Sequence, residues 1–286
     1  MFEIYERMRG VVDGALDTMD ISVLHAAGLS LFQGLALIAI AWAGISYVLE
    51  PAELKKGNTV IGKIVRQMFF VGFVYWLVDS GFETVFVEGI DWSLQKIALI
   101  IMPSSSNTSL AGGMDYMWVS MQAVGQLIAQ LFEGAQVWDV LTVAGKNMPT
   151  LIVLTMSLFI QALSAMGYAT FLTVSLFLVK LVLMLGPIFI PWLVLEKTAF
   201  LFWGWLRFLI IASLYQVVGA AILYFAYKLL AGEAAIIAEL NGSFPESLMI
   251  AVMVASLHLT ILYLITQIPK ISQALVSGML GQLQQN

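Results

Sequence analysis

The sequence predicts an all-α polytopic membrane protein with about five transmembrane helices, a re-entrant or interfacial hairpin and amphipathic helices on the outer face. Of its 286 residues, 60% are hydrophobic and only 11% are charged, whereas soluble domains average about 45–50% apolar and about 25% charged residues. Long charge-free windows recur along the chain, and the sign of the charge between them alternates. This composition argues against a soluble enzyme.

Five segments are predicted to cross the membrane. A span needs about 20 mainly apolar residues, because every backbone polar group must be satisfied within the segment. A fifth and shorter window, residues 67–78, is long enough only if it extends back to about Val60, with Lys63 and Arg66 reaching the interface. The four clear windows are residues 21–49, 147–179, 208–227 and 247–269.

The charges between the spans predict the orientation, because cytoplasmic loops are rich in Lys and Arg. Summed over alternate segments, one side holds eight basic and three acidic groups, and the other holds five basic and fifteen acidic groups. We therefore expect the N-terminus outside and the C-terminus inside. The expected regions are an outer amphipathic segment 1–20, two spans within 21–78 joined by an inner loop 50–66, an outer loop 79–146 with amphipathic helices, later spans 147–269 and an inner C-terminal segment 270–286.

One apolar stretch, residues 181–195, does not fit five full crossings. A second full crossing between residues 147 and 195 would place the basic residues that follow on the outside, against the charge rule. Gly186, Pro187 and Pro191 favour a break, because each proline lacks an N–H and disfavours helix before it. We expect one crossing followed by a re-entrant or interfacial hairpin.

Polar side chains form stripes on three predicted helices. Because polar groups facing lipid are costly, these stripes are expected to meet protein or water. Interhelical hydrogen bonding and the lining of a hydrated lumen both remain open for the stripes in the spans. The amphipathic helix 116–132 either lies on the membrane surface or the bundle, or lines a passage shared between subunits. The stripe residues are Ser157, Gln161, Ser164 and Tyr168 in the third span, Ser213 and Gln216 in the fourth, and Gln122, Gln126 and Gln130 in the amphipathic helix.

Small and aromatic residues predict further contacts. Ala26, Ser30 and Gly34 form a ridge on the first span that allows close approach of another helix. Trp203 and Trp205 are expected at the level of the lipid headgroups.

Ionisable residues within the spans are few. His258 lies mid-span and is a candidate functional residue, whereas His25 is expected to be an interfacial histidine. Lys180 and Arg207 adjoin the inner side and are expected to reach the interface. We find no acid in the middle of a predicted span, which argues against a coupled transporter. The chain has no cysteine, which excludes disulfides, thiolate metal sites and cysteine nucleophiles. No catalytic motif is found either, and we expect neither a metal site nor catalytic residues.

The charge pattern also argues against tight binding of nucleic acid. The net charge is −5, and no run of Lys or Arg is longer than the pair Lys55 and Lys56. Such a surface cannot neutralise a row of phosphates.

The segment LMLGPIFI at 183–190, followed by FWGWLR at 202–207 and a hydrophobic span, resembles the signature region of the TrbL family. This family comprises polytopic inner-membrane subunits of conjugative type IV secretion systems. The layout of the spans is similar over most of the chain, and the closer match is the shorter, tail-less type. Pro191 is a second break that departs from the motif.

The resemblance implies a non-enzymatic subunit in the bacterial inner membrane, with a periplasmic N-terminus, periplasmic amphipathic helices and a cytoplasmic C-terminus. It implies a ring of about five copies that supports DNA and protein translocation and pilus biogenesis. The implied partners are pilus, stalk and core-complex proteins, membrane lipids and a transient DNA or protein substrate. No cofactor is expected other than phospholipid bound near residues 200–208.

Two alternatives remain open at this point. The first alternative is a small-solute transporter or ion channel with His258 and the Gln161 stripe in its pathway. The second alternative is a structural membrane anchor that recruits partners through residues 79–146.

Overall fold

The fold is helical throughout the part of the chain that the computed structural model describes, which comprises residues 7, 10, 11, 14, 21–49, 57–101, 112–132, 140–146, 148–238 and 244–283. No strand occurs among these residues. Four of the helices are long and apolar enough to cross a membrane, or five if one bent pair counts as a single span. The prediction of an all-α polytopic membrane protein is confirmed.

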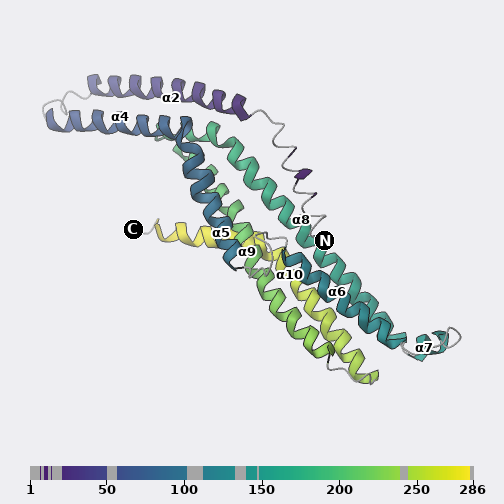
Figure 1. Cartoon of the computed structure of the whole chain (residues 1–286). Helices are drawn as coiled ribbons and strands as arrows, with labels where there is room; N and C mark the ends of the chain where they lie inside the picture. Colours follow the sequence, from purple (N-terminus) through teal and green to yellow (C-terminus); the bar gives the residue numbers. More distant parts are fainter. Residues whose placement is uncertain are drawn as a thin grey trace. The chain divides into compact units, whose positions relative to one another are not determined.

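Four of the helices extend or reproduce the charge-free windows. The first coincides with its window, whereas the last three are longer, because an isolated lysine marks the edge of an apolar window without ending a helix. Lys180 and Lys270, for example, lie inside helices. The elements are α2 (Ile21–Leu49), α4 (Gly57–Asp79), the π-helix η1 (Glu83–Asp91), α5 (Trp92–Ile101), α6 (Gly112–Leu131), α7 (Val140–Lys146), α8 (Met148–Phe189), the 3₁₀-helix η2 (Ile190–Val194), α9 (Ala199–Ala238) and α10 (Phe244–Leu283) (Figure 1).

The chain divides into two compact units. Unit 1 consists of residues 1–12, 95–175 and 214–286, and unit 2 consists of residues 13–94 and 176–213. The long helices α8 and α9 are both divided between the units, with one part of each helix in unit 1 and the other part in unit 2.

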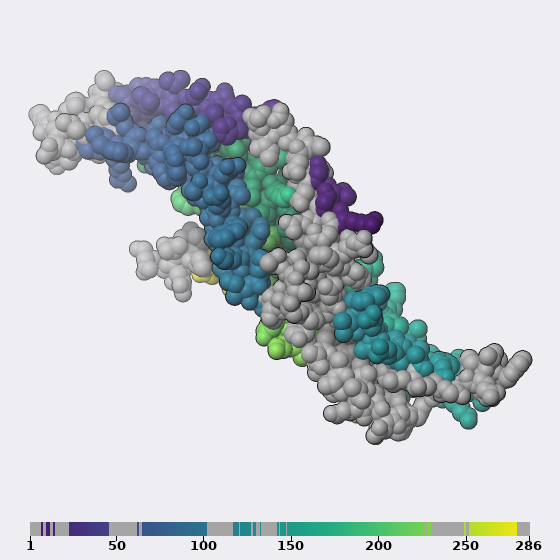
Figure 2. All heavy atoms as spheres, in the orientation of Figure 1, coloured from purple at the N-terminus to yellow at the C-terminus, as the bar shows by residue number. Residues whose placement is uncertain are grey.

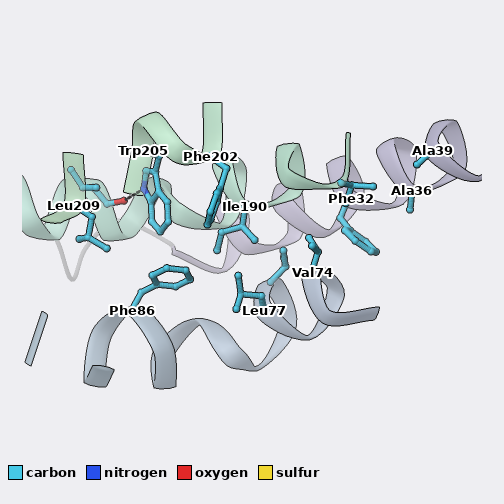
Figure 3. Packing of buried hydrophobic residues seen from close by; sticks show 13 residues of the cluster. Phe32, Ala36, Ala39, Val74, Leu77, Phe86, Ile190, Phe202, Trp205 and Leu209 are labelled. Atoms are coloured by element: carbon cyan, nitrogen blue, oxygen red, sulfur yellow. Dashed lines mark hydrogen bonds between the residues drawn. The ribbon is translucent and has the colours of Figure 1, made fainter. Parts of the chain in front are cut away.

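Unit 2 is built on the pair α2 and α4, which lie side by side (Figures 1 and 2). The rings of Phe32 on α2 and Tyr75 on α4 are 5.6 Å apart, and Gln67 Nε2 donates to the carbonyl oxygen of Ala39 at 3.4 Å. The helix η2 packs against both helices through the fully buried Ile190. Figure 3 shows the buried apolar side chains of this unit meeting from α2, α4, η1, η2 and α9.

The helix α4 ends at a sharp bend. Residues Val65–Asp79 and Glu83–Ile101 are inclined by 70° to each other. The region expected to begin the outer loop is therefore helical, with Glu83 and Glu88 exposed on one side and Phe86 buried on the other. Phe86 packs edge-on against Trp205 at a ring distance of 5.0 Å. An amphipathic helix at this position exposes the charged side chains and buries the apolar ones.

The segment 181–195 differs from the expected hairpin. α8 continues through Gly186 and Pro187 to Phe189, and η2 and a short turn then lead into α9. Pro187 lies two residues before the last residue of α8, so it removes only one hydrogen bond near the end of the helix, and its fixed φ suits a helix. The α-helix ends where Pro191 enters the first turn of η2.

Candidate functional site

The polar stripe of α8 lies inside unit 1. Ser157, Gln161, Ser164 and Tyr168 are all buried, with exposed fractions of 0–2%. Their spacing of 4, 3 and 4 residues places them on one helix face. This face is turned toward the protein in the described chain and not toward lipid.

The helix facing this stripe is α10, which runs beside α8 (Figure 1). Ser164 Oγ lies 2.9 Å from the carbonyl oxygen of Ile160 and 3.3 Å from that of His258 on α10. A Cβ placed on Gly167 would lie 3.6 Å from the side chain of Leu262, so α8 and α10 remain in contact one turn further along. The imidazole of His258 is buried and its Nδ1 lies 2.9 Å from the carbonyl oxygen of Val254. The two sequence candidates, the stripe and His258, are therefore neighbours.

Most polar atoms of the stripe are not used in interhelical hydrogen bonds. Ser157 Oγ and both side-chain heteroatoms of Gln161 have no hydrogen-bond partner, and Thr150 Oγ1, two turns earlier on the same face, has none either. Each of these side chains is at least nine-tenths buried. Protein–protein hydrogen bonding thus accounts for Ser164 but not for Ser157 or Gln161.

The shorter stripe of α9 is divided between the two units. Gln216 belongs to unit 1, where both of its side-chain heteroatoms are buried without a partner. Ser213 belongs to unit 2, where its hydroxyl donates to Asp91 Oδ1 at 3.2 Å. Both side chains are almost fully buried.

Asp91 is a buried acid that sequence reasoning missed. It ends η1 and bonds Ser213, which lies near the middle of the apolar stretch Ala199–Ala226. Asp91 itself lies outside the predicted spans, so the absence of acids within those spans did not reveal that an acid packs against one of them. The available signal was the apolar spacing of Phe86 and Ile90 beside Asp91, which marks an amphipathic helix within a region assigned to a loop by its charge.

The glutamine face of α6 points away from the core. Gln122 and Gln126 are exposed, whereas Met117 and Val124 on the opposite face are buried. The side chain of Gln130 lies outside the described residues.

The ridge of Ala26, Ser30 and Gly34 is exposed in the described chain. α2 uses Gly28 for its close contact instead, since a Cβ there would collide with the backbone oxygen of Pro187. The ridge stays a prediction for contact with another molecule.

The motif residues Gly186, Pro187 and Pro191 are buried packing positions. A Cβ on Gly186 would collide with the ring of Phe82 and would lie 2.9 Å from Trp205. Glycine and proline here allow η1 and α9 to approach the end of α8 closely.

The two tryptophans expected at the headgroups differ. Trp203 is 58% exposed, as a lipid-contacting side chain would be, whereas Trp205 is only 5% exposed. Trp205 Nε1 donates to the carbonyl oxygen of Val182 at 2.8 Å (Figure 3). The interfacial assignment of Trp205 was therefore wrong, because its ring fills the core and its N–H has a protein acceptor. Arg207 is exposed and Lys180 is half-buried.

Comparison with known proteins adds one finding. A family model described as TrbL/VirB6 plasmid conjugal transfer protein matches residues 36–268, which include the polar stripe, the buried acid and the Gly186–Pro187 packing site. Comparison with curated proteins gives no match. Among the described residues, no group of three or more His, Asp or Glu side chains is placed to hold a metal ion.

Proposed function

The chain belongs to the TrbL/VirB6 plasmid conjugal transfer family, and from this membership we propose that it is an inner-membrane channel or platform subunit supporting DNA and protein translocation and pilus biogenesis. The family makes the chain a membrane subunit related to type IV secretion, with other components of that machinery as partners. The proposed orientation has a periplasmic N-terminus and a cytoplasmic C-terminus, as the alternating charges favour.

We propose further that the subunit forms a closed ring of about five copies, because the family resemblance implies such a ring and homo-oligomers generally adopt closed symmetry. The observation that supports a shared passage is the exposed glutamine face of α6. The stripe of α8 is buried within unit 1, whereas Gln122 and Gln126 remain accessible to a neighbour or a substrate.

The chemistry of that face suits transit and not retention. Amide side chains hydrogen-bond to water and to passing polar groups, but they carry no charge. The chain as a whole has a net charge of −5 and no basic cluster that would hold a nucleic-acid backbone. A phosphate chain moving past such a face is solvated without being bound.

Crosslinking tests the placement of this face. The chain has no cysteine, so a thiol-reactive crosslinker can react only with the cysteine that is introduced. We expect Gln126→Cys to give crosslinked copies in intact membranes with a short bifunctional maleimide. Val124→Cys, which is fully buried on the same helix, is the matched control and should give none. A Gln126→Cys protein that stays uncrosslinked would argue against a ring with α6 at its axis.

Transfer measurements test the function itself. Deletion of the gene for this chain should abolish conjugation, and Gln122→Leu combined with Gln126→Leu should reduce the transfer frequency by at least an order of magnitude at unchanged protein levels. Gln33→Leu alters an exposed glutamine on α2 and serves as the control. Normal conjugation in the deletion strain would refute the proposed function.

A further inference from the structure

The buried face of α8 carries a run of polar atoms for which the protein supplies no partner. They are Thr150 Oγ1, Ser157 Oγ, and Oε1 and Nε2 of Gln161. The spacing of seven and four residues places them on one face, along about 16 Å of the helix axis. The run ends at Ser164, whose hydroxyl contacts carbonyl oxygens of α8 and α10.

Three helices of unit 1 enclose this face. Val124 on α6, Leu154 on α8 and Val254 on α10 form one buried apolar cluster. Leu154 lies between Thr150 and Ser157 in sequence, so α6 and α10 both reach α8 at the level of the unpartnered atoms. Lipid therefore does not cover these atoms, and their partner must lie within the bundle.

Buried polar atoms in proteins almost always have a hydrogen-bond partner, and ordered water supplies it where the protein does not. The requirement is stricter at membrane depth, because bulk water is absent there. Hydroxyl and amide groups both donate and accept, as water does, whereas a metal ion or an organic anion would demand one kind of group only. The donor and acceptor set on α8 therefore fits water.

We propose that this face of α8 binds ordered water molecules inside unit 1 at two places, one at Thr150 and one at Ser157 and Gln161, on either side of the apolar contact of Leu154 with Val124 and Val254. Ser164, with the buried Tyr168 and Leu172 beyond it on α8, bounds the second of these water sites. This inference does not depend on the proposed role in secretion.

Unit 1 also contains buried polar atoms without hydrogen-bond partners at a further place, where α9 faces α10. Gln216 Oε1 and Nε2 and Ser272 Oγ are buried without partners. A Cβ on Gly219 would lie 3.5 Å from Phe171 and 3.9 Å from Ile268, which fixes where α8, α9 and α10 meet. Gln216 and Ser272 lie about 4.5 Å and about 6 Å along their helices from that meeting point. These side chains mark a separate water site of the same kind.

Hydroxyl-radical footprinting of the full chain in lipid nanodiscs tests the proposal. X-rays convert bound water to radicals, so a buried side chain beside ordered water is oxidised whereas one in a dry core is protected. His258, whose carbonyl oxygen contacts Ser164, is the probe beside the bound water, and Trp205 and Phe86 in the apolar cluster of unit 2 are the buried comparison. We expect oxidation of His258, corrected for intrinsic reactivity, to exceed that of the comparison residues several-fold.

Isotope labelling and variants sharpen the test. In ¹⁸O-labelled water the oxygen added to His258 should carry the label. Ser157→Ala with Gln161→Leu removes the groups that hold the water and should lower oxidation of His258 to the level of Trp205. Gln33→Leu, at an exposed glutamine on α2, is the matched control and should leave the oxidation of His258 unchanged. Equal protection of His258 and Trp205 in the unmodified chain, a measurement that needs no variant, would overturn the proposal, as would unchanged oxidation in the folded double variant.

Discussion

The imidazole Nε2 of His25 on α2 lies 3.0 Å from the carbonyl oxygen of Val78 on α4. A carbonyl oxygen only accepts, so Nε2 carries the hydrogen and donates it. Val78 is fully buried and precedes the 70° bend between α4 and η1 by one residue. His25 is thus a positioning residue that ties α2 to the end of α4, a role that its place near the start of α2 did not suggest.

We predict that His25→Leu destabilises the protein by about 1–3 kcal/mol, because the loss leaves a buried carbonyl without its donor. The measurement is the unfolding midpoint of the purified protein in detergent. His25→Gln retains a donor and should recover part of the loss, whereas Val23→Ala, at an exposed site on the same helix, should have little effect. Equal stability of His25→Leu and the unmodified protein would show that the contact contributes nothing.

Gly28 and Gly34 form a matched pair on α2. A Cβ on Gly28 collides with the backbone oxygen of Pro187, whereas a Cβ on Gly34 meets no atom within 4 Å. We expect Gly28→Ala to destabilise unit 2 by about 1–3 kcal/mol, since backbone cannot yield as a flexible side chain does. Gly34→Ala should leave the unfolding midpoint unchanged or slightly raised.

Substitutions at Gly28 and Gly34 also distinguish an effect on folding from an effect on assembly. If the ridge of Ala26, Ser30 and Gly34 meets a second molecule, Gly34→Leu should reduce copy number or transfer while leaving the midpoint of the isolated chain intact. Normal assembly and transfer in Gly34→Leu would leave lipid as the neighbour of this ridge.

Trp203 and Trp205 lie two residues apart on opposite faces of α9 and should respond oppositely to substitution. Trp205→Phe removes the donor to Val182 and part of a buried ring, so we expect a loss of about 1–3 kcal/mol. Trp203→Phe alters an exposed ring and should change stability by less than about 0.5 kcal/mol. Thermal unfolding of both variants is the measurement, and similar losses in both would contradict the assigned burial.

The spans were predictable because hydrocarbon imposes a minimum apolar length. α2 begins and ends at the limits of its charge-free window. Helix ends beyond the membrane were not predictable in this way, since Lys180 and Lys270 interrupt the apolar pattern but not the backbone hydrogen bonding. The bend after α4 was not predicted either, because the amphipathic helices expected within residues 79–146 carry no sequence signal for the angle between neighbouring helices.

The polar stripe was recognisable because amides and hydroxyls at helical spacing need a protein or water environment. What encloses it depends on contacts between residues far apart in sequence, such as Ser164 with His258. The face of α9 that holds Trp205 had a usable signal: Phe202, Trp205 and Leu209 follow at helical spacing and are all buried. Tryptophan chemistry alone could not choose between headgroup and core, since both offer an acceptor to the indole N–H.

Asp91 and Ser213 join η1 to α9 through a hydrogen bond of 3.2 Å in an almost fully buried setting. A bond to a carboxylate in such surroundings contributes about 1.5–3 kcal/mol, and removing one partner leaves the other desolvated. We expect Asp91→Ala and Ser213→Ala each to lower the free energy of unfolding, with Asp91→Ala the larger loss because Asp91 has a further interaction in the structure.

A double-mutant cycle isolates the pair, since neighbours that share a bond are not additive. The two substitutions together should cost less than the sum of the single losses by at least about 0.5 kcal/mol. Ser256→Ala, at an exposed hydroxyl that bonds only to its own helix, combined with Asp91→Ala is the additive control. Additive losses for Asp91 and Ser213 would mean that the buried acid is held by its other contact, and that this hydrogen bond does not help to hold η1 against α9.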